Sequence, residues 1–128
     1  MKKSLLLLAA LACTGAIAQE KEIWACQQLE STMLSWGSNG WEQYVVTPEP
    51  LLLTVNGANS SYKTGNDELR LQCSPLESFE KRTSCISSTS GDHLLLDPET
   101  GKMGKSRLYG AINNAYSVTA QIYNCTKF

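Results

Sequence analysis

The 128-residue sequence contains a single histidine, at position 93, so any histidine-based catalysis depends on it. Ser90 and Asp92 lie close to His93, and serine, histidine and aspartate act together as nucleophile, base and orienting acid in many hydrolases. Neighbouring residues on a strand point to opposite faces, however, so Asp92 is badly placed to orient His93. The chain also lacks a G-x-S-x-G elbow. The pattern favours a surface histidine at the start of a strand, and we assign no catalytic residue.

Two patterns that bind phosphate or metal in other proteins fail here on spacing. Gly104-Lys105-Ser106 matches the end of a P-loop, but the position five residues before Gly104, where that motif needs glycine, is Glu99. H-E-x-x-H is missing, and the acidic segments 66–68 and 97–99 lack the D-x-D-x-D-G spacing of a calcium loop. We therefore expect neither a metal nor a cofactor.

Paired carboxylates are a further chemistry to consider, because two acids on either side of a glycosidic bond can hydrolyse it. The sequence has 12 acidic residues, and nothing in their spacing marks one pair as special. The chain is also short for a catalytic cleft. A small hydrolase that uses paired carboxylates is kept as an alternative, and a non-enzymatic protein is favoured.

Residues 59–65, N-S-S-Y-K-T-G, have the composition of a binding loop. Tyrosine supplies contact area while serine and glycine supply adaptable hydrogen bonds, a combination that protein-binding loops use. A solvated connection between two strands explains the same composition. The binding residues of this hypothesis are Ser60, Ser61, Tyr62, Lys63 and Thr64.

Two further surface features have both a functional and a structural interpretation. Trp36 and Trp41 flank G-S-N-G, and they form either an exposed aromatic patch for a partner or a sugar, or a brace across a hairpin, which we prefer. Among three cations, alternation puts Lys105 and Arg107 on one strand face and Lys102 on the other. This split favours an ordinary charged edge that opposes aggregation.

The first eighteen residues have the features of an export signal. Lys2 and Lys3 form a charged start, residues 5–12 are apolar, and A-I-A precedes a cleavage site after Ala18. The apolar run is shorter than the roughly 20 residues that cross a bilayer, so we expect no membrane insertion. Cys13 leaves with the signal. The alternative of a lipid-modified Cys13 requires a lipoprotein box, which the residues before it match poorly.

Removal of the signal leaves residues 19–128, a length typical of one domain. Without Lys2 and Lys3 the counts are 9 basic and 12 acidic residues, a net charge of about −3. Nucleic-acid binding depends on basic patches, so no nucleic acid is expected. We expect a periplasmic or secreted protein whose partner is another protein.

Four cysteines remain in the mature chain, and an even number in a short exported chain indicates disulfides. Of the three possible connectivities we favour Cys73–Cys85, which closes a local loop, with Cys26–Cys125, which joins the first and last strands. A chain-entropy argument assigns about 3 and about 4.7 kcal/mol to these two closures.

Short apolar segments, regularly separated by turn residues, predict the fold. We expect an all-β protein, a small antiparallel barrel or sandwich of seven to eight short strands. The polar run 58–67 is predicted to be the longest loop, and the capping-box pattern at 74–77 predicts at most one short helical turn, over Pro75–Lys81. A turn is expected at 97–101.

The last predicted strand, residues 117–125, raises a question about its two faces. Val118 and Ile122 alternate with polar residues, which indicates one buried and one solvated face. Tyr123 and Cys125 fall on the solvated face, and Trp24 and Cys26 show the same parity in the first strand. Either the Cys26–Cys125 bond lies on the outer face of the sheet, or a β-bulge near Tyr123 switches the faces. We favour the outer position, because the same parity recurs in both strands.

Several motifs of the mature chain resemble an uncharacterised family of small exported proteins from Gram-negative bacteria. They are W-x-C at 24–26, the tryptophan hairpin at 36–41, D-P-x-T-G with the strand that follows it at 97–110, and the ending C-T-K-F at 125–128. This resemblance implies export and little about activity.

A second resemblance concerns the segment 61–65, S-Y-K-T-G, which is followed by Glu68, Leu69 and Cys73. It is similar to periplasmic inhibitors of c-type lysozyme, which are exported, disulfide-linked β-barrels that insert a loop into the lysozyme cleft. The similarity implies a protein that inhibits or neutralises a cell-wall-active enzyme or toxin by offering a cation and hydroxyls to its carboxylates. A secreted ligand-binding module is the remaining alternative.

Overall fold

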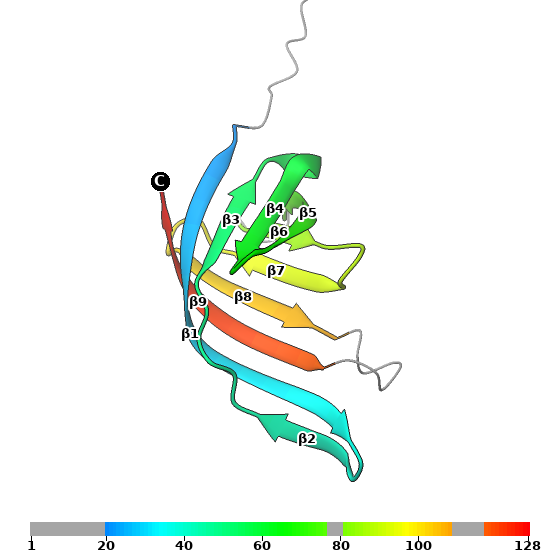
Figure 1. The fold of residues 1–128 in the computed structure, drawn as a ribbon. Helices are drawn as coiled ribbons and strands as arrows, with labels where there is room; N and C mark the ends of the chain where they lie inside the picture. The colour runs from blue at the N-terminus through cyan, green and yellow to red at the C-terminus, as the bar shows by residue number, and fades with distance from the viewer. Residues whose placement is uncertain (1–19, 77–80, 109–116) are drawn as a thin grey trace, which may run out of the picture.

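The computed structural model describes residues 20–76, 81–108 and 117–128, which form one antiparallel sheet (Figure 1). Its strands and one 3₁₀ turn, η1, follow in chain order: β1 (Glu22–Gly37), β2 (Gly40–Tyr44), β3 (Leu51–Val55), η1 (Gly57–Asn59), β4 (Ser60–Thr64), β5 (Asp67–Pro75), β6 (Thr83–Ile86), β7 (Asp92–Leu96), β8 (Lys102–Arg107) and β9 (Val118–Lys127). In the described part of the chain no helix is long and apolar enough to cross a membrane.

The sheet closes on itself because its first and last strands pair. The strand order is β2-β1-β3-β4-β5-β6-β7-β8-β9, and β1 also pairs with β9. Eight strands therefore form a closed barrel, and β2 is an additional ninth strand beside β1. The predicted all-β barrel is confirmed, with one strand more than the upper estimate.

The long strand β1 serves both the barrel and a hairpin that extends beyond it. Residues 22–26 pair with β3, and residues 33–37 pair with β2. Between Gln28 and Glu30 the pairing with β9 shifts by one residue, a β-bulge that bends the strand. Figure 1 shows β1 running along the barrel wall and then, together with β2, past its end. The hairpin turn places its positive φ at Gly40, where glycine has no steric penalty.

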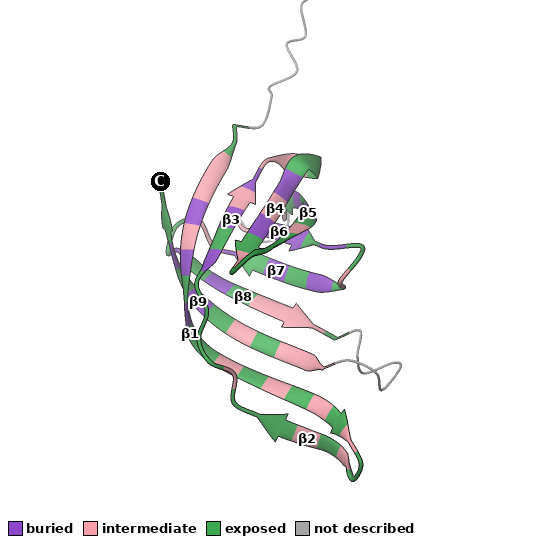
Figure 2. Cartoon of the chain, viewed as in Figure 1, coloured by how far each residue is buried: buried purple, intermediate pink, exposed green. Residues whose placement is uncertain are grey.

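Alternate residues of each strand point into the barrel and fill it, as the buried bands along β3, β4 and β7 show (Figure 2). Apart from the four cysteines, the buried apolar and aromatic side chains come from seven of the strands: Trp24, Leu51, Leu53, Val55, Tyr62, Leu71, Leu94, Leu96, Met103 and Tyr123. By contrast, residues 29–37 of β1 and all of β2 contain no buried residue.

Both predicted disulfides are confirmed, Cys26–Cys125 and Cys73–Cys85. Each joins directly opposed residues of neighbouring strands, and the first spans the closure of the barrel between β1 and β9. The predicted outer position of Cys26–Cys125 is wrong, since both of its cysteines are buried. Alternation in the last strand does separate its cysteine from its apolar residues, as predicted. The apolar residues, however, lie on the outer face, where Ile122 is 53% exposed.

The predicted loop 58–67 is also wrong, because the segment contains η1, β4 and the start of β5. Its polar residues suit a strand because their hydrogen bonds are satisfied locally: Ser60 Oγ accepts from the Asn56 amide and donates to the Gly57 carbonyl, both at 2.7 Å. The helical turn predicted over Pro75–Lys81 falls largely on residues 77–80, which lie outside the described residues, and Pro75 ends β5.

The turn predicted at 97–101 is confirmed and is tied to the last strand. The Gly101 amide donates to the Asp97 carbonyl at 2.8 Å, and the Cys125 amide donates to the Gly101 carbonyl at 2.7 Å. Gly101 has φ +72°, and a Cβ there would lie 2.2 Å from the Cys125 carbonyl oxygen. Any other residue would therefore separate this turn from β9.

Candidate functional site

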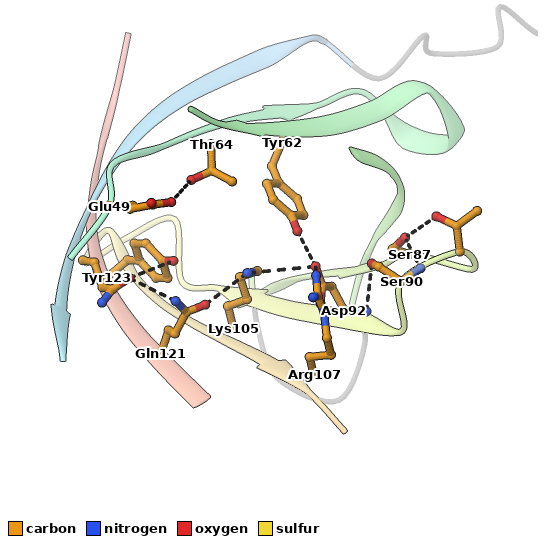
Figure 3. Close-up of polar contacts among 12 residues, drawn as sticks. Glu49, Tyr62, Thr64, Ser87, Ser90, Asp92, Lys105, Arg107, Gln121 and Tyr123 are labelled. Atoms are coloured by element: carbon orange, nitrogen blue, oxygen red, sulfur yellow. Dashed lines mark hydrogen bonds and ion pairs between the residues drawn. The ribbon is translucent and has the colours of Figure 1, made fainter. Parts of the chain in front are cut away.

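The inside of the barrel holds a polar network centred on Asp92, whose side chain is fully buried (Figure 3). Arg107 donates from Nε to Asp92 Oδ1 at 2.6 Å and from Nη2 to Oδ2 at 3.0 Å. Tyr62 reaches across the barrel from β4, and its hydroxyl donates to the same Oδ2. Three charge-assisted hydrogen bonds thus satisfy the carboxylate without solvent.

The strand register places these groups. Asp92 on β7 is directly opposite Arg107 on β8, and both belong to the inward-facing set of their strands. On β7 that set continues with Leu94 and Leu96, and on β8 it begins at Met103. The charged residues therefore continue the same inward rows that supply the apolar core, at one end of the barrel.

The network fixes the protonation of its members. Burial alone raises the pKa of Asp92, but the hydrogen bonds from Arg107 and Tyr62 and the charge of Lys105 outweigh burial and hold this pKa below its usual range. Burial and the hydrogen bond to Asp92 raise the pKa of Tyr62. Asp92 is therefore ionised at neutral pH and Tyr62 carries its proton, an arrangement that suits a structural ion pair better than a general acid.

Lys105 occupies the middle of the barrel and links this network to a second set of polar groups. Its Nζ lies 3.0 Å from Gln121 Oε1, 5.1 Å from the centre of the Tyr62 ring and 3.9 Å from Asp92 Oδ2. Its side chain is only 10% exposed. The predicted charged edge of Lys105 and Arg107 is therefore wrong, since these cations face the inside of the barrel.

A chain of amides continues from Lys105 to β1. Gln121 Nε2 donates to Gln28 Oε1 at 3.0 Å, and the Tyr123 hydroxyl lies 3.5 Å from the same oxygen. Burial raises the pKa of Tyr123 to about 12. Gln28 is 5% exposed, and its Nε2 has no hydrogen-bond partner within the described ranges. A small cavity of about 60 Å³ lies here, lined in part by Gln28, Lys105 and Tyr123.

The structure does not bring the five predicted binding residues together on one surface. Ser60 and Tyr62 point into the barrel and are buried. Ser61 and Lys63 lie on the outer face, where both contact Glu68, at 3.1 Å from Ser61 Oγ and 3.8 Å from Lys63 Nζ. Thr64 donates to Glu49 Oε2 at 3.1 Å, at the rim of the barrel (Figure 3).

The predicted arrangement around His93 agrees with the structure. Asp92 points inward while His93 is exposed on the outer face, so the two side chains do not form a catalytic pair. His93 Nε2 instead lies 2.9 Å from the hydroxyl of Ser84. Ser90 Oγ accepts a hydrogen bond from the Asp92 amide at 3.3 Å, which is a turn contact.

The outer face of β7, β8, β9 and β1 has a groove of about 570 Å³. Its floor consists of residues with small side chains, Gly104, Ser106 and Ala120, and larger residues stand on either side. Across the four strands the register aligns two outward rows, which are His93, Ser106, Ala120 and Thr32, and then Leu95, Gly104, Ile122 and Glu30. Leu95 is 37% exposed, so this face offers apolar surface to solvent.

The same outer face continues onto the β1–β2 hairpin. Trp36 and Trp41 are directly opposed, and their rings meet edge to face with centroids 5.4 Å apart. They brace the hairpin as predicted, and they remain 47% and 38% exposed. Leu34, which is 39% exposed, lies between this pair and the groove along β1. Apolar side chains thus extend from β7 to β2 on one side of the molecule.

Two tests for known kinds of site give negative results. The described residues contain no group of three or more histidine, cysteine, aspartate and glutamate side chains that could hold a metal ion. Comparison of the chain with protein-family models, curated proteins and solved structures finds no match.

Sequence reasoning missed both the inner network and the outer groove, although one pattern pointed to the inner network. On β7 and β8, charged residues share their parity with buried residues: Asp92 with Leu94, and Lys105 with Met103. When charged residues on two neighbouring strands alternate in phase with the core residues, the pattern indicates a buried ion pair.

Proposed function

We propose that the mature chain is an exported protein that acts by binding another protein, in the periplasm or outside the cell. The outer face of β7–β8–β9–β1–β2 is its binding surface. The observation that supports this proposal is the set of exposed apolar side chains on one face, Leu95 and Ile122 at the groove and Leu34, Trp36 and Trp41 on the hairpin. Large apolar patches on a protein surface mark interaction sites more often than scattered single residues do.

The chemistry of this surface defines the partner. Leu95 and Ile122 border a floor without large side chains, so a protruding apolar side chain of the partner can enter between them. Trp36 and Trp41 add aromatic area, and tryptophan is enriched among the residues that dominate binding energy. Nearby charges are few, with Glu30 on this face as the main acid, so burial of apolar area supplies most of the binding energy.

A sharper form of the proposal is that the partner is a cell-wall-active enzyme or a toxin, which this protein inhibits or neutralises. It rests on the resemblance of residues 61–65 to lysozyme inhibitors. Because Tyr62 is buried, the outer groove and the accessible Ser61 and Lys63 are what remains to contact the enzyme. An assay of c-type lysozyme with a micromolar excess of the oxidised mature protein tests this form, and unaltered lysis would eliminate it.

The general proposal is tested with three immobilised baits: the wild type, Ile122→Lys and Leu52→Glu. Ile122 is 53% exposed and faces Glu30, whereas Leu52 is 40% exposed and faces Lys63 from β3, outside the groove. Both substitutions thus introduce a charge opposite a complementary one, but only Ile122→Lys alters the binding surface.

We expect periplasmic extract or culture medium of the source cell to yield a protein that wild type and Leu52→Glu retain and Ile122→Lys loses. The purified candidate must show the same order of affinities. If every retained protein binds Ile122→Lys as well as wild type, the outer face is not the binding surface. If the patch holds a second copy of this chain, sedimentation detects a dimer that Ile122→Lys dissociates, which also contradicts a distinct partner.

A further inference from the structure

The small cavity at the end of the barrel, near the β2–β3 connection, is lined by two buried donor groups, the Lys105 ammonium and the Gln28 amide. It has a volume of about 60 Å³ and is lined by Gln28, Val46, Thr47, Glu49, Leu51, Thr64, Lys105, Gln121 and Tyr123. A water molecule takes up roughly 30 Å³ in the liquid, and sites for drug-sized ligands begin at roughly 300 Å³. The cavity therefore suits a group of a few heavy atoms.

The charges inside this end of the barrel do not balance. Among the described residues, two cations, Lys105 and Arg107, face one buried carboxylate, Asp92. Arg107 and Tyr62 already occupy both oxygens of that carboxylate. Lys105 is left at 3.9 Å from Asp92 and gives its one short hydrogen bond to the neutral amide of Gln121.

Gln28 adds an independent sign of a ligand. It is 95% buried, it lines the cavity, and its Nε2 has no partner in the described part of the chain, whereas its Oε1 accepts from Gln121 and Tyr123. A buried donor without a partner costs about 1–3 kcal/mol, so it is normally matched by an acceptor. An ammonium and a primary amide thus both offer donors to the same small space.

Glu49 shows which kind of acceptor fits. It lies on the exposed connection between β2 and β3, at the rim of the cavity, where its Oε2 accepts from Thr64. Burial lowers the pKa of Lys105, and the charges of Asp92 and, to a smaller extent, Glu49 oppose this shift. The rim therefore already holds one carboxylate close enough for the buried ammonium to sense.

We propose that this cavity binds a carboxylate group, held by Lys105 Nζ and Gln28 Nε2 and entering beside Glu49. Two sources have this chemistry, a small free carboxylate such as acetate and the carboxyl terminus of a peptide. The negative charge of Glu49 repels either kind of carboxylate and therefore weakens binding. The site then favours ligands that can displace the Glu49 side chain.

The experiment is an NMR titration of ¹⁵N-labelled, oxidised mature protein with sodium acetate, with sodium chloride at equal ionic strength as the control. We expect a saturable shift of the Gln28 side-chain amide with acetate and none with chloride. Glu49→Gln removes the repulsion of an exposed charge and is expected to tighten binding about two- to fivefold. Glu68→Gln, which removes an exposed carboxylate that does not line the cavity, should leave affinity within about twofold of wild type.

A second set of titrations distinguishes a small free carboxylate from the carboxyl terminus of a peptide. N-acetyl-Gly-Gly is compared with its C-terminal amide, which is the same size without the charge. Saturable binding of acetate and the peptide acid alike assigns the site to free carboxylates. Binding of the acid alone, and not of its amide, assigns the site to peptide termini.

Two results overturn the proposal. One is the lack of a saturable shift for acetate and for the peptide acid in both wild type and Glu49→Gln. The other is saturable binding, read from the backbone amides of the residues that line the cavity, that persists unchanged in Gln28→Leu, a variant that keeps Lys105 and the Asp92 ion pair. Gln28→Leu removes the donor with a side chain of similar size, so this readout does not depend on the less conservative loss of Lys105.

Discussion

Strands β7, β8 and β9 have two faces that reverse the usual distribution of side chains. Inside the barrel, next to the apolar core, they hold Asp92, Lys105 and Arg107, whereas outside they expose Leu95 and Ile122. Burial of an ion costs several kcal/mol of desolvation free energy. The inner face offsets this cost by pairing and hydrogen-bonding its charged groups. The outer apolar residues Leu95 and Ile122 remain exposed among the residues that the structure describes. The difference supports a structural role for the inner Asp92–Arg107 ion pair and the proposed contact role for the outer apolar surface.

Among changes to the inner face, removal of the disulfide that closes the barrel is expected to lower the free energy of unfolding the most. Replacement of Cys26 and Cys125 by alanine removes a bond that spans 99 residues, whereas the Cys73–Cys85 bond spans 12. In the chain-entropy model the losses are about 4.7 and about 3 kcal/mol. Urea unfolding of this double variant, and of the one in which Cys73 and Cys85 are replaced by alanine, measures the two losses. An equal loss in the two would show that local packing, not chain closure, sets the contribution of each bond.

The second inner-face change is Asp92→Asn, which leaves Arg107 without its counter-charge. Loss of one partner of a buried ion pair destabilises a protein by about 3–5 kcal/mol. The pKa of Asp92 is depressed in the folded state, so its contribution is present above the unfolded-state pKa of about 4 and is lost as the pH falls through the folded-state pKa. The difference between wild type and variant should therefore shrink when unfolding is measured from pH 7 down to pH 2.

The control for this prediction is Glu68→Gln on the outer face of β5. Glu68 pairs with Lys63 at 3.8 Å, and both side chains are more than half exposed. Exposed pairs contribute about 0–1 kcal/mol, so the free energy of unfolding should hardly change. If Asp92→Asn proves as mild as Glu68→Gln, the inner network is not what stabilises this end of the barrel.

The smallest expected effect on stability is on the outer apolar face. Ile122→Thr keeps a β-branched side chain suited to a strand and removes apolar surface that is already half exposed. We expect a change within about 0.5 kcal/mol, as for most surface substitutions, together with weaker partner binding. Thermal unfolding and binding of the purified partner measure the two. A loss of stability above 2 kcal/mol would mean that Ile122 supports the fold and would end the contrast between the faces.

The sequence allowed the fold class, the two disulfides and the 97–101 turn to be predicted, because each depends on local chemistry or on spacing. The orientation of the strands could not be predicted in the same way. Alternation in β9 separates Val118 and Ile122 from Tyr123 and Cys125, but it does not say which set lies inside. The assumption that the apolar set is buried fails because aromatic residues and a disulfide occupy the inside.

The misread segment 58–67 has a similar cause. Serine, threonine and asparagine favour turns because their side chains compete for backbone hydrogen bonds, and glycine favours them because it tolerates a positive φ. Ser60 instead uses its hydroxyl to complete η1 at the start of β4. Tyr62 looked like a contact residue, and its hydroxyl instead finds Asp92, which lies 30 residues further along the chain. Such long-range pairing of polar groups leaves no local trace in the sequence.

The pairing of β1 with β9 has a consequence for the order of folding. Consecutive hairpins from β3 to β8 can form as soon as their residues are available, but the barrel cannot close until β9, the ten residues Val118–Lys127, has joined it. In a chain that emerges from its N-terminus, Cys26 must wait unpaired while Cys73 and Cys85 are already neighbours. The slow, non-local step is therefore the final one, and premature pairing of Cys26 with either of the other two is the error that an oxidising compartment would have to correct.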